Sequence, residues 1–209
     1  SNFFIPHKPA SSLHKNVGNI NAIVEHKGKL WLCTDGGLLI YDPVRETYEI
    51  CYFNIPRSAT NREIKFIQKE GYRYLWVSIY YCGLYLLDME SGRIVREVSD
   101  FPYNQVRRIV RAQDGIYWIA LGVDSPVLLY DFDKDQYQDH FQVAGKTFPV
   151  SLINVQDVYA ESNYIWMGTR AEGLYRYHLS SGDWKYYGIT AKENEYILTT
   201  HVSTIYSDN

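Results

Sequence analysis

Short apolar runs alternate with polar turns along most of the chain, and this pattern returns at nearly constant intervals. Each repeat holds a tryptophan inside an apolar run, then a break containing glycine or proline, then a second apolar run. The tryptophans are Trp31, Trp76, Trp118 and Trp166, at intervals of 45, 42 and 48 residues. Fixed periods of this length are typical of solenoids, propellers and other repeat proteins.

A second matched segment precedes each tryptophan by 8 or 9 residues, at Ile23, Ile67, Ile109 and Val158. In the first repeat, turns with glycine, proline or aspartate separate four short runs, which predicts strands at 20–25, 29–34, 37–42 and 47–52. No periodic run reaches the length of a helix without a breaker. Four antiparallel strands in roughly 45 residues indicate a β-propeller blade.

The predicted fold is therefore all-β, with four complete four-stranded blades in a single propeller region. Their approximate limits are 16–53, 60–99, 103–143 and 151–190. Residues 201–209 match the first strand of a further blade, and residues 3–5 match the last strand of an earlier one. The tryptophans are expected to pack between blades, because one blade cannot bury its own faces.

The repeat resembles the two-component regulator propeller repeat, in which Ile-x-x-Ile precedes W-(I/V/M)-G-T and G-L-x-x-Y-D. The last repeat gives the best copy, in 155–158, 166–169 and 173–177. The other repeats depart from it: Cys33 replaces glycine in the first, the second has Trp76-Val77-Ser78-Ile79, and Pro126-Val127 replaces Gly-Leu in the third. The resemblance covers residues from about 16 to 190.

The resemblance implies the periplasmic sensor region of a hybrid two-component histidine kinase from a gram-negative gut bacterium. Such repeats usually form seven-bladed rings, so four blades are expected to be an arc of a larger propeller. The implied function is non-catalytic sensing of a glycan-derived oligosaccharide, with signalling across the membrane. An arc exposes unpaired strand edges, so self-association as a homodimer is also expected.

Composition limits the other partners. The formal net charge is −3, which argues against a nucleic acid or an anionic membrane surface. No apolar run approaches the ~20 residues of a membrane-spanning helix, so this fragment is not expected to insert into a membrane. Cofactor strings such as GxGxxG and GxxxxGK are absent from the sequence, and no cofactor is predicted.

The spacing of the cysteines, histidines and carboxylates in the sequence gives little support for a metal site or for reactive thiols. Cys33, Cys51 and Cys82 form no CxxC pair; Cys33 and Cys51 lie in apolar runs and are expected to be buried free thiols. The six histidines lack metal-ligand spacing, and His26 and His178 lie at predicted turns, where solvent exposure is expected. Alternate carboxylates in 131–139 resemble the start of a calcium loop, but Gln136 replaces its glycine, so a structural hairpin is favoured.

The candidate ligand-binding residues lie in the loops between the second and third strands of each blade. Rigid scaffolds concentrate functional residues on such loops. The residues are Asp35, Tyr80, Tyr81, Asp124, Arg170 and Glu172. Stacking aromatics beside charged groups suit a carbohydrate, although a hydrophilic edge without a ligand has the same composition. A carbohydrate-active hydrolase or lyase and a protein-interaction scaffold remain alternatives.

Overall fold

The computed structural model describes most of the predicted blades. The described residues are 18–51, 63–101, 105–113, 115–122, 125, 127–138, 142–143, 146–147, 154–188 and 201–207. They form strands, turns and loops, and none of them lies in a helix that could cross a membrane. The chain divides into two compact units, residues 1–104 and residues 105–209.

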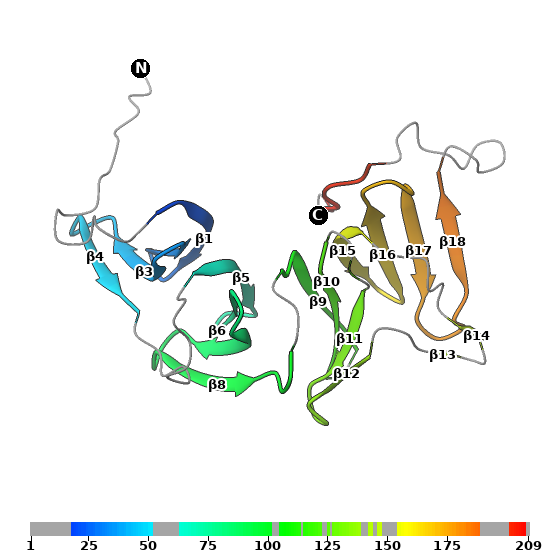
Figure 1. Cartoon of the computed structure of the whole chain (residues 1–209), viewed down its shortest axis with the longest axis horizontal. Helices are drawn as coiled ribbons and strands as arrows, with labels where there is room; N and C mark the ends of the chain where they lie inside the picture. The colour runs from blue at the N-terminus through cyan, green and yellow to red at the C-terminus, as the bar shows by residue number, and fades with distance from the viewer. Residues whose placement is uncertain are drawn as a thin grey trace, which may run out of the picture. The chain divides into compact units, whose positions relative to one another are not determined.

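Unit 1 contains two four-stranded antiparallel sheets, each with its strands in sequence order (Figure 1). Blade 1 consists of β1 (Ile20–His26), β2 (Lys29–Thr34), β3 (Gly37–Asp42) and β4 (Thr47–Ile50). Blade 2 consists of β5 (Ile64–Glu70), β6 (Tyr74–Ile79), β7 (Gly83–Asp88) and β8 (Arg93–Glu97). Successive strands pair through short turns, as the hairpin pattern predicts.

Unit 2 repeats this arrangement (Figure 1). Blade 3 consists of β9 (Arg108–Gln113), β10 (Ile116–Ala120), β11 (Leu128–Asp131) and β12 (Gln136–Gln138). Blade 4 consists of β15 (Val155–Glu161), β16 (Tyr164–Thr169), β17 (Leu174–His178) and β18 (Trp184–Tyr187). The four sheets confirm the all-β class and the four four-stranded blades.

Between the last strand of blade 3 and the first strand of blade 4, the structure adds a small hairpin that the sequence does not predict. It pairs β13 (Gln142–Val143) with β14 (Lys146–Thr147). Two-residue strands are too short to produce the alternation of apolar and polar positions that reveals a strand.

The core of unit 1 lies between blades 1 and 2. Trp31 of blade 1 is 4% exposed and belongs to one apolar cluster with Ile64, Ile67 and Val77 of blade 2. Each blade has two faces because side chains alternate along its strands. We call the face that carries the tryptophan the back face and the face of the matched isoleucine the front face.

Unit 2 has the same packing. Trp118 of blade 3 is 1% exposed and lies in one cluster with Val155, Val158 and Met167 of blade 4. Its ring centroid is 5.4 Å from that of Tyr177, also in blade 4. The back face of one blade is thus buried by the front face of the next, as the position of the tryptophans predicts.

The first strands of blades 1, 2 and 4 contain a β-bulge at the same position. The pairing register skips Asn21 in β1, Lys65 in β5 and Gln156 in β15. A bulge places two residues opposite one, so the extra side chain leaves the regular alternation of the sheet. These polar residues therefore follow the first apolar residue of each strand without disturbing the buried faces.

Residues 201–207 lie against blade 4 where a following first strand would begin. The Val202 N–H donates to the Thr169 carbonyl at 2.8 Å. A Cβ atom on Gly168 would come within 2.6 Å of Val202, so glycine permits the approach. Cys33 has the equivalent place in blade 1, with its Sγ 3.0 Å from the Ile64 carbonyl oxygen.

Residues 201–207 have no strand assignment, and residues 3–5 lie outside the described residues. The partial blades at the two ends therefore stay predictions.

In the turn between β11 and β12, the polar side chains form hydrogen bonds with other groups of the same turn. Asp131 accepts hydrogen bonds from the backbone N–H groups of Asp133 and Lys134, and from the Lys134 ammonium at 2.7 Å. This is the geometry of a hairpin turn, which the sequence favours over a calcium loop. Within the described residues, no three His, Cys, Asp or Glu side chains form a group that could hold a metal ion.

The three cysteines are free thiols; Cys33 is buried, while Cys51 and Cys82 are half-buried. Burial raises the pKa of the Cys33 thiol to about 12, which keeps it protonated and unreactive.

The expected exposure of His26 is wrong. The side chain is 4% exposed, because the ring of Tyr72 covers it edge-on with the centroids 5.2 Å apart. Burial, followed by the charges of Lys69 and Lys27, lowers the pKa of His26. Neither ring nitrogen has a hydrogen-bond partner among the described residues. His178, by contrast, is half-buried and hydrogen-bonded.

Candidate binding surface

One edge of unit 1 gathers three of the predicted residues around a lysine. Asp35 lies in the turn between β2 and β3, and Tyr80 and Tyr81 lie in the turn between β6 and β7. The Lys65 ammonium is 3.4 Å from the Asp35 carboxylate and 5.9 Å from the centroid of the Tyr80 ring. We call these four residues the loop-edge cluster; they form one continuous polar and aromatic surface.

Asp35 is held by two asparagines at the start of β1. Its carboxylate accepts hydrogen bonds from the Asn19 N–H at 3.0 Å, the Asn19 side chain at 3.1 Å and the Asn21 side chain at 3.0 Å. Gly18 allows this approach, since a Cβ atom there would lie 2.7 Å from Asp35. The Asn21 hydrogen bond first, and then that from Asn19, hold the pKa of Asp35 well below its usual range. Asp35 is therefore a fixed anion.

Lys65 is the bulge residue of β5, and the bulge directs its side chain to this edge. It forms ion pairs with Glu63 and Asp35, and these raise the pKa of the ammonium, with Glu63 contributing most. Its side chain remains 35% exposed. The ammonium is thus oriented by two carboxylates and still reaches solvent.

Tyr80 and Tyr81 form a pair of aromatic rings, in which Tyr80 is half-buried and Tyr81 is exposed. Their centroids are 4.2 Å apart, and the Tyr80 hydroxyl donates to that of Tyr81 at 3.3 Å. Tyr81 is 71% exposed and has a φ of 58°, which is uncommon for a bulky residue. Six other non-glycine residues in the described part of the chain have a similar positive φ, among them Lys27 and Asp135 in hairpin turns, so this conformation belongs to the turn geometry.

Hydrogen bonds to Cys82 fix the turn that carries the two tyrosines. The Cys82 N–H donates to the Ile79 carbonyl at 2.9 Å. The buried Tyr85 hydroxyl donates to the Cys82 carbonyl at 2.7 Å. The rings are therefore presented on a rigid support.

In unit 2, Arg170 and Glu172 share the loop between β16 and β17. The Arg170 N–H donates to the Asn154 carbonyl at 3.0 Å, and its side chain is exposed. Glu172 accepts from the Tyr175 hydroxyl at 3.2 Å, and its N–H donates to the Thr169 hydroxyl. The described residues include no ion pair between the two side chains, so they act as separate groups.

An ion pair between a buried carboxylate and a partly exposed arginine lies under this loop. Asp157 is 3% exposed and accepts from Arg108 of blade 3 at 2.8 Å. Its carboxylate also accepts from the Val158 N–H at 3.0 Å and the Ile205 N–H at 2.8 Å. Asp157 therefore connects blade 3, blade 4 and residues 201–207.

The structure brings Asp35, Tyr80 and Tyr81 together in unit 1, and Arg170 and Glu172 into one loop in unit 2. Asp124 lies outside the described residues. Their roles in ligand binding stay predictions. The prediction missed Lys65, together with Asn19, Asn21 and Glu63, which orient the cluster. A signal was available: the second residue of each matched segment is polar, namely Asn21, Lys65, Arg107 and Gln156.

The chemistry of the loop-edge cluster suits binding better than acid–base catalysis. Exposed tyrosine rings can stack on the C–H face of a sugar, while Lys65 can donate hydrogen bonds to hydroxyls. A general acid for glycoside hydrolysis requires a carboxyl group with a raised pKa. The pKa of Asp35 is instead lowered, so this residue cannot fill that role.

No protein-family model matches the chain, and no curated protein sequence matches it. Among solved structures, the chain is similar to the extracellular domain of a protein assigned to a hybrid two-component system of B. thetaiotaomicron. The identity is 15% and the TM-score 0.55, over 96% of this chain and 32% of that one. This chain therefore spans about a third of the length of that domain.

Two further structures are similar over most of this chain. The WD40 repeats of RRP9 are 12% identical with a TM-score of 0.56, over 86% of this chain and 55% of that one. The designed protein Ika4 is 10% identical with a TM-score of 0.55, over 80% of this chain and 96% of that one. The four sheets are propeller blades. At these identities, the comparisons bear on the fold alone.

Proposed function

We propose that this chain is a non-catalytic ligand-binding module of a hybrid two-component sensor, and that it binds a glycan-derived oligosaccharide at the loop edge. The observation that carries the proposal is the loop-edge cluster, in which Tyr80 and Tyr81 stand beside the fixed Asp35–Lys65 pair. Pre-oriented aromatic rings next to charged hydrogen-bonding groups are what a sugar ring requires.

Two independent observations support the sensor assignment. The repeat motifs resemble those of two-component regulator propellers. The fold is similar to that of an extracellular domain assigned to a hybrid two-component system. The same resemblance supports a periplasmic location. Within such a protein, the ligand would stabilise one arrangement of the propeller and so shift the populations that control the kinase.

We also propose that the isolated chain self-associates. Ile20 and Ile23 of blade 1 are 53% and 58% exposed, whereas their counterparts Ile64 and Ile67 in blade 2 are 1% and 5% exposed. The front face of blade 1 thus presents apolar side chains that are buried elsewhere in the repeat. Light scattering should give a mass near twice 24.4 kDa, and a monomeric mass at high concentration would contradict the proposal.

Calorimetric titration with defined oligosaccharides tests the binding proposal. Tyr80→Ala and Tyr81→Ala should each lower the affinity by about tenfold, because each removes one stacking surface. Tyr72→Ala is the matched control, since Tyr72 is also an exposed tyrosine of blade 2 but covers His26 at the turn between β5 and β6. Release of smaller products from any oligosaccharide, or binding that is unaffected by both tyrosine variants, would overturn the proposal.

A further inference from the structure

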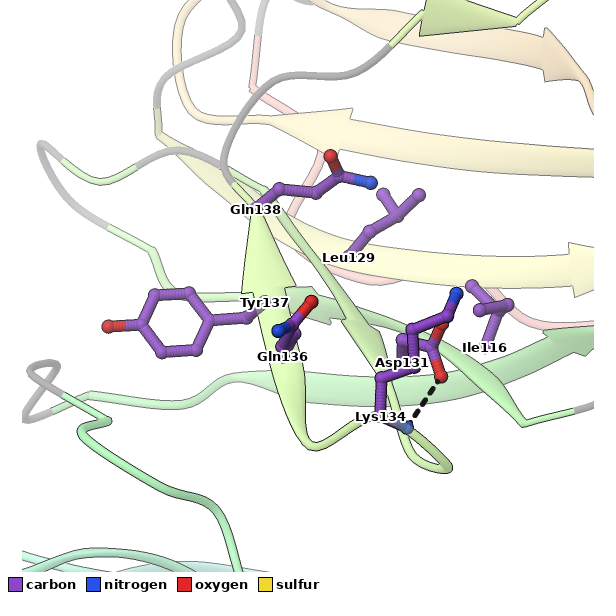
Figure 2. A pocket seen from close by; sticks show the side chains of 7 residues that line it. All are labelled: Ile116, Leu129, Asp131, Lys134, Gln136, Tyr137 and Gln138. Atoms are coloured by element: carbon purple, nitrogen blue, oxygen red, sulfur yellow. Dashed lines mark hydrogen bonds and ion pairs between the residues drawn. The ribbon is translucent and has the colours of Figure 1, made fainter.

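Two hollows in unit 2 are built from the same seven positions of consecutive blades. The blade-3 hollow, about 280 Å³, is lined by Ile116, Leu129, Asp131, Lys134, Gln136, Tyr137 and Gln138 (Figure 2). The blade-4 hollow, about 350 Å³, is lined by Tyr164, Arg176, His178, Ser181, Asp183, Trp184 and Lys185. The strand registers match: Ile116 pairs with Asp131 as Tyr164 pairs with His178.

The chemistry of the two hollows differs at three of these positions above all. Ile116, Leu129 and Gln138 of the blade-3 hollow correspond to Tyr164, Arg176 and Lys185 of the blade-4 hollow. The blade-3 hollow holds one cation and one carboxylate, and Figure 2 shows Lys134 paired with Asp131. In the blade-4 hollow, two cations face one carboxylate, that of Asp183. The blade-4 hollow therefore carries an excess of positive charge.

Arg176 is held between aromatic rings. Its guanidinium carbon lies 4.6 Å from the centroid of Tyr164, 5.4 Å from that of Trp166 and 5.9 Å from that of Tyr187. Among the described residues, it forms no ion pair with a carboxylate. Stacking uses the faces of the guanidinium and leaves its in-plane N–H donors, which match a carboxylate in a bidentate arrangement.

Hydrogen bonds hold the other polar side chains on one side of the blade-4 hollow in place. The imidazole of His178 is hydrogen-bonded to the Asn163 side chain at 3.2 Å and, through Nδ1, to Ser181. The Ser181 hydroxyl also donates to Asp183 at 2.7 Å. Tyr164 meets His178 edge-on, with centroids 4.9 Å apart. These contacts pre-organise the aromatic side of the hollow before any ligand arrives.

The hollow does not depend on whether another blade packs on blade 4. Trp118 in blade 3 is fully covered by blade 4, and the blade-3 hollow beside it is still open. The equivalent hollow of blade 4 lies in the same place relative to Trp166. It would therefore stay accessible if a further blade covered that tryptophan.

We propose that the blade-4 hollow is a binding site for a small carboxylate carried on a ring, such as a uronic acid. Arg176 would bind the carboxylate through two parallel N–H donors, with Lys185 adding a second positive charge. The face of the sugar ring would pack against Tyr164, whose partners hold it in place. This site is separate from the loop-edge cluster and does not rest on the function proposed there.

Titration of the 209-residue chain with D-glucuronate, D-glucose and acetate tests this site. D-glucuronate should bind, while D-glucose lacks the carboxylate and acetate lacks the ring. Arg176→Leu gives the hollow the residue of blade 3 and should lower the affinity for D-glucuronate by about tenfold or more, the cost of losing a charged bidentate contact. Lys134→Ala is the matched control, because it removes a cation from the blade-3 hollow; binding should not change.

Three results would overturn the assignment: equal binding of acetate and D-glucuronate, equal binding of D-glucose and D-glucuronate, or no effect of Arg176→Leu on D-glucuronate binding. Light scattering on the same samples shows whether D-glucuronate or Arg176→Leu changes the mass of the protein; a mass that falls with Arg176→Leu would also overturn the assignment and show that a second copy occupies this face. Tyr81→Ala should leave D-glucuronate binding intact. A failure of the blade-4 proposal can therefore be distinguished from a failure of the loop-edge proposal.

Discussion

Trp118 and Trp166 have the same position in consecutive blades, yet Trp118 is 1% exposed and Trp166 is half-buried. Their own sheets are alike, so the difference comes from the segment that packs on each one. Blade 4 covers Trp118, whereas the described residues beyond Gly188 are only 201–207. In this repeat, the burial of a tryptophan is therefore supplied by the next blade, and its contribution to stability depends on that neighbour.

The largest expected effect separates these two tryptophans. Trp118→Ala should lower the free energy of unfolding by about 3–5 kcal/mol, because it leaves a cavity between blades 3 and 4. Trp166→Ala should cost much less, since its ring is not enclosed. Denaturant unfolding of both variants measures the difference. Equal losses would show that the tryptophan stabilises its own blade and that the neighbour adds little.

A second prediction compares the buried carboxylate of Asp157 with the half-buried carboxylate of Asp131 at a hairpin turn. Asp157→Asn should destabilise the chain by about 2 kcal/mol, because it removes the buried charge that accepts hydrogen bonds from Arg108 and from the backbone N–H groups of Val158 and Ile205. Asp131→Asn, at the outer turn of blade 3, should leave the unfolding midpoint nearly unchanged. Thermal unfolding at neutral pH tests both variants. If the two substitutions lower the stability equally, the position of Asp157 between blades does not add to the stability of the fold.

A third, smaller effect concerns the approach of residues 201–207. Gly168→Ala places a Cβ atom against Val202, and the expected cost is about 1 kcal/mol. Because the Val202 N–H donates to Thr169, hydrogen exchange of that amide should become faster while the amides of β16 stay protected. The same exchange rate in both proteins would mean that this segment does not depend on close packing against Gly168.

The smallest effect compares two histidines at equivalent kinds of turn. The pKa of His26 is lowered in the fold, so between that value and about 6.5 the unfolded chain binds more protons. Stability should therefore decrease as the pH falls below about 6.5, with Lys69 and Lys27 opposing protonation and Glu25 and Glu90 favouring it. Unfolding between about pH 5 and pH 7 should show this slope. His26→Phe should remove it and His178→Gln should not; a slope that survives His26→Phe would contradict the prediction.

Much of the fold could be predicted because the same sequence pattern occurs four times along the chain. Apolar alternation, turn residues and the regular tryptophans predict each four-stranded blade. The position of His26 could not be predicted in this way. Its burial depends on Tyr72 of the neighbouring blade, a contact between residues 46 positions apart that no local pattern encodes.

The candidate site was predictable in part. The sequence places Tyr80 and Tyr81 in the loop between the second and third strands of blade 2, and the structure has their rings side by side there; their role in binding stays a prediction. Lys65 was missed because it lies within an apolar strand segment, and only the bulge directs it to the edge. The blade-4 hollow was also missed, since its residues come from three strands and become a group only when the two blades are compared position by position.

The bulge at Asn21, Lys65 and Gln156 has a consequence for how such proteins diversify. A residue outside the regular alternation can be exchanged without altering strand pairing or the buried faces. Each of these blades thus has one position at its loop edge whose side chain interacts with neighbouring loops and is not constrained by the packing of the two faces. Successive copies of a duplicated gene segment could acquire different side chains there, and so different ligand preferences, while the scaffold stayed constant.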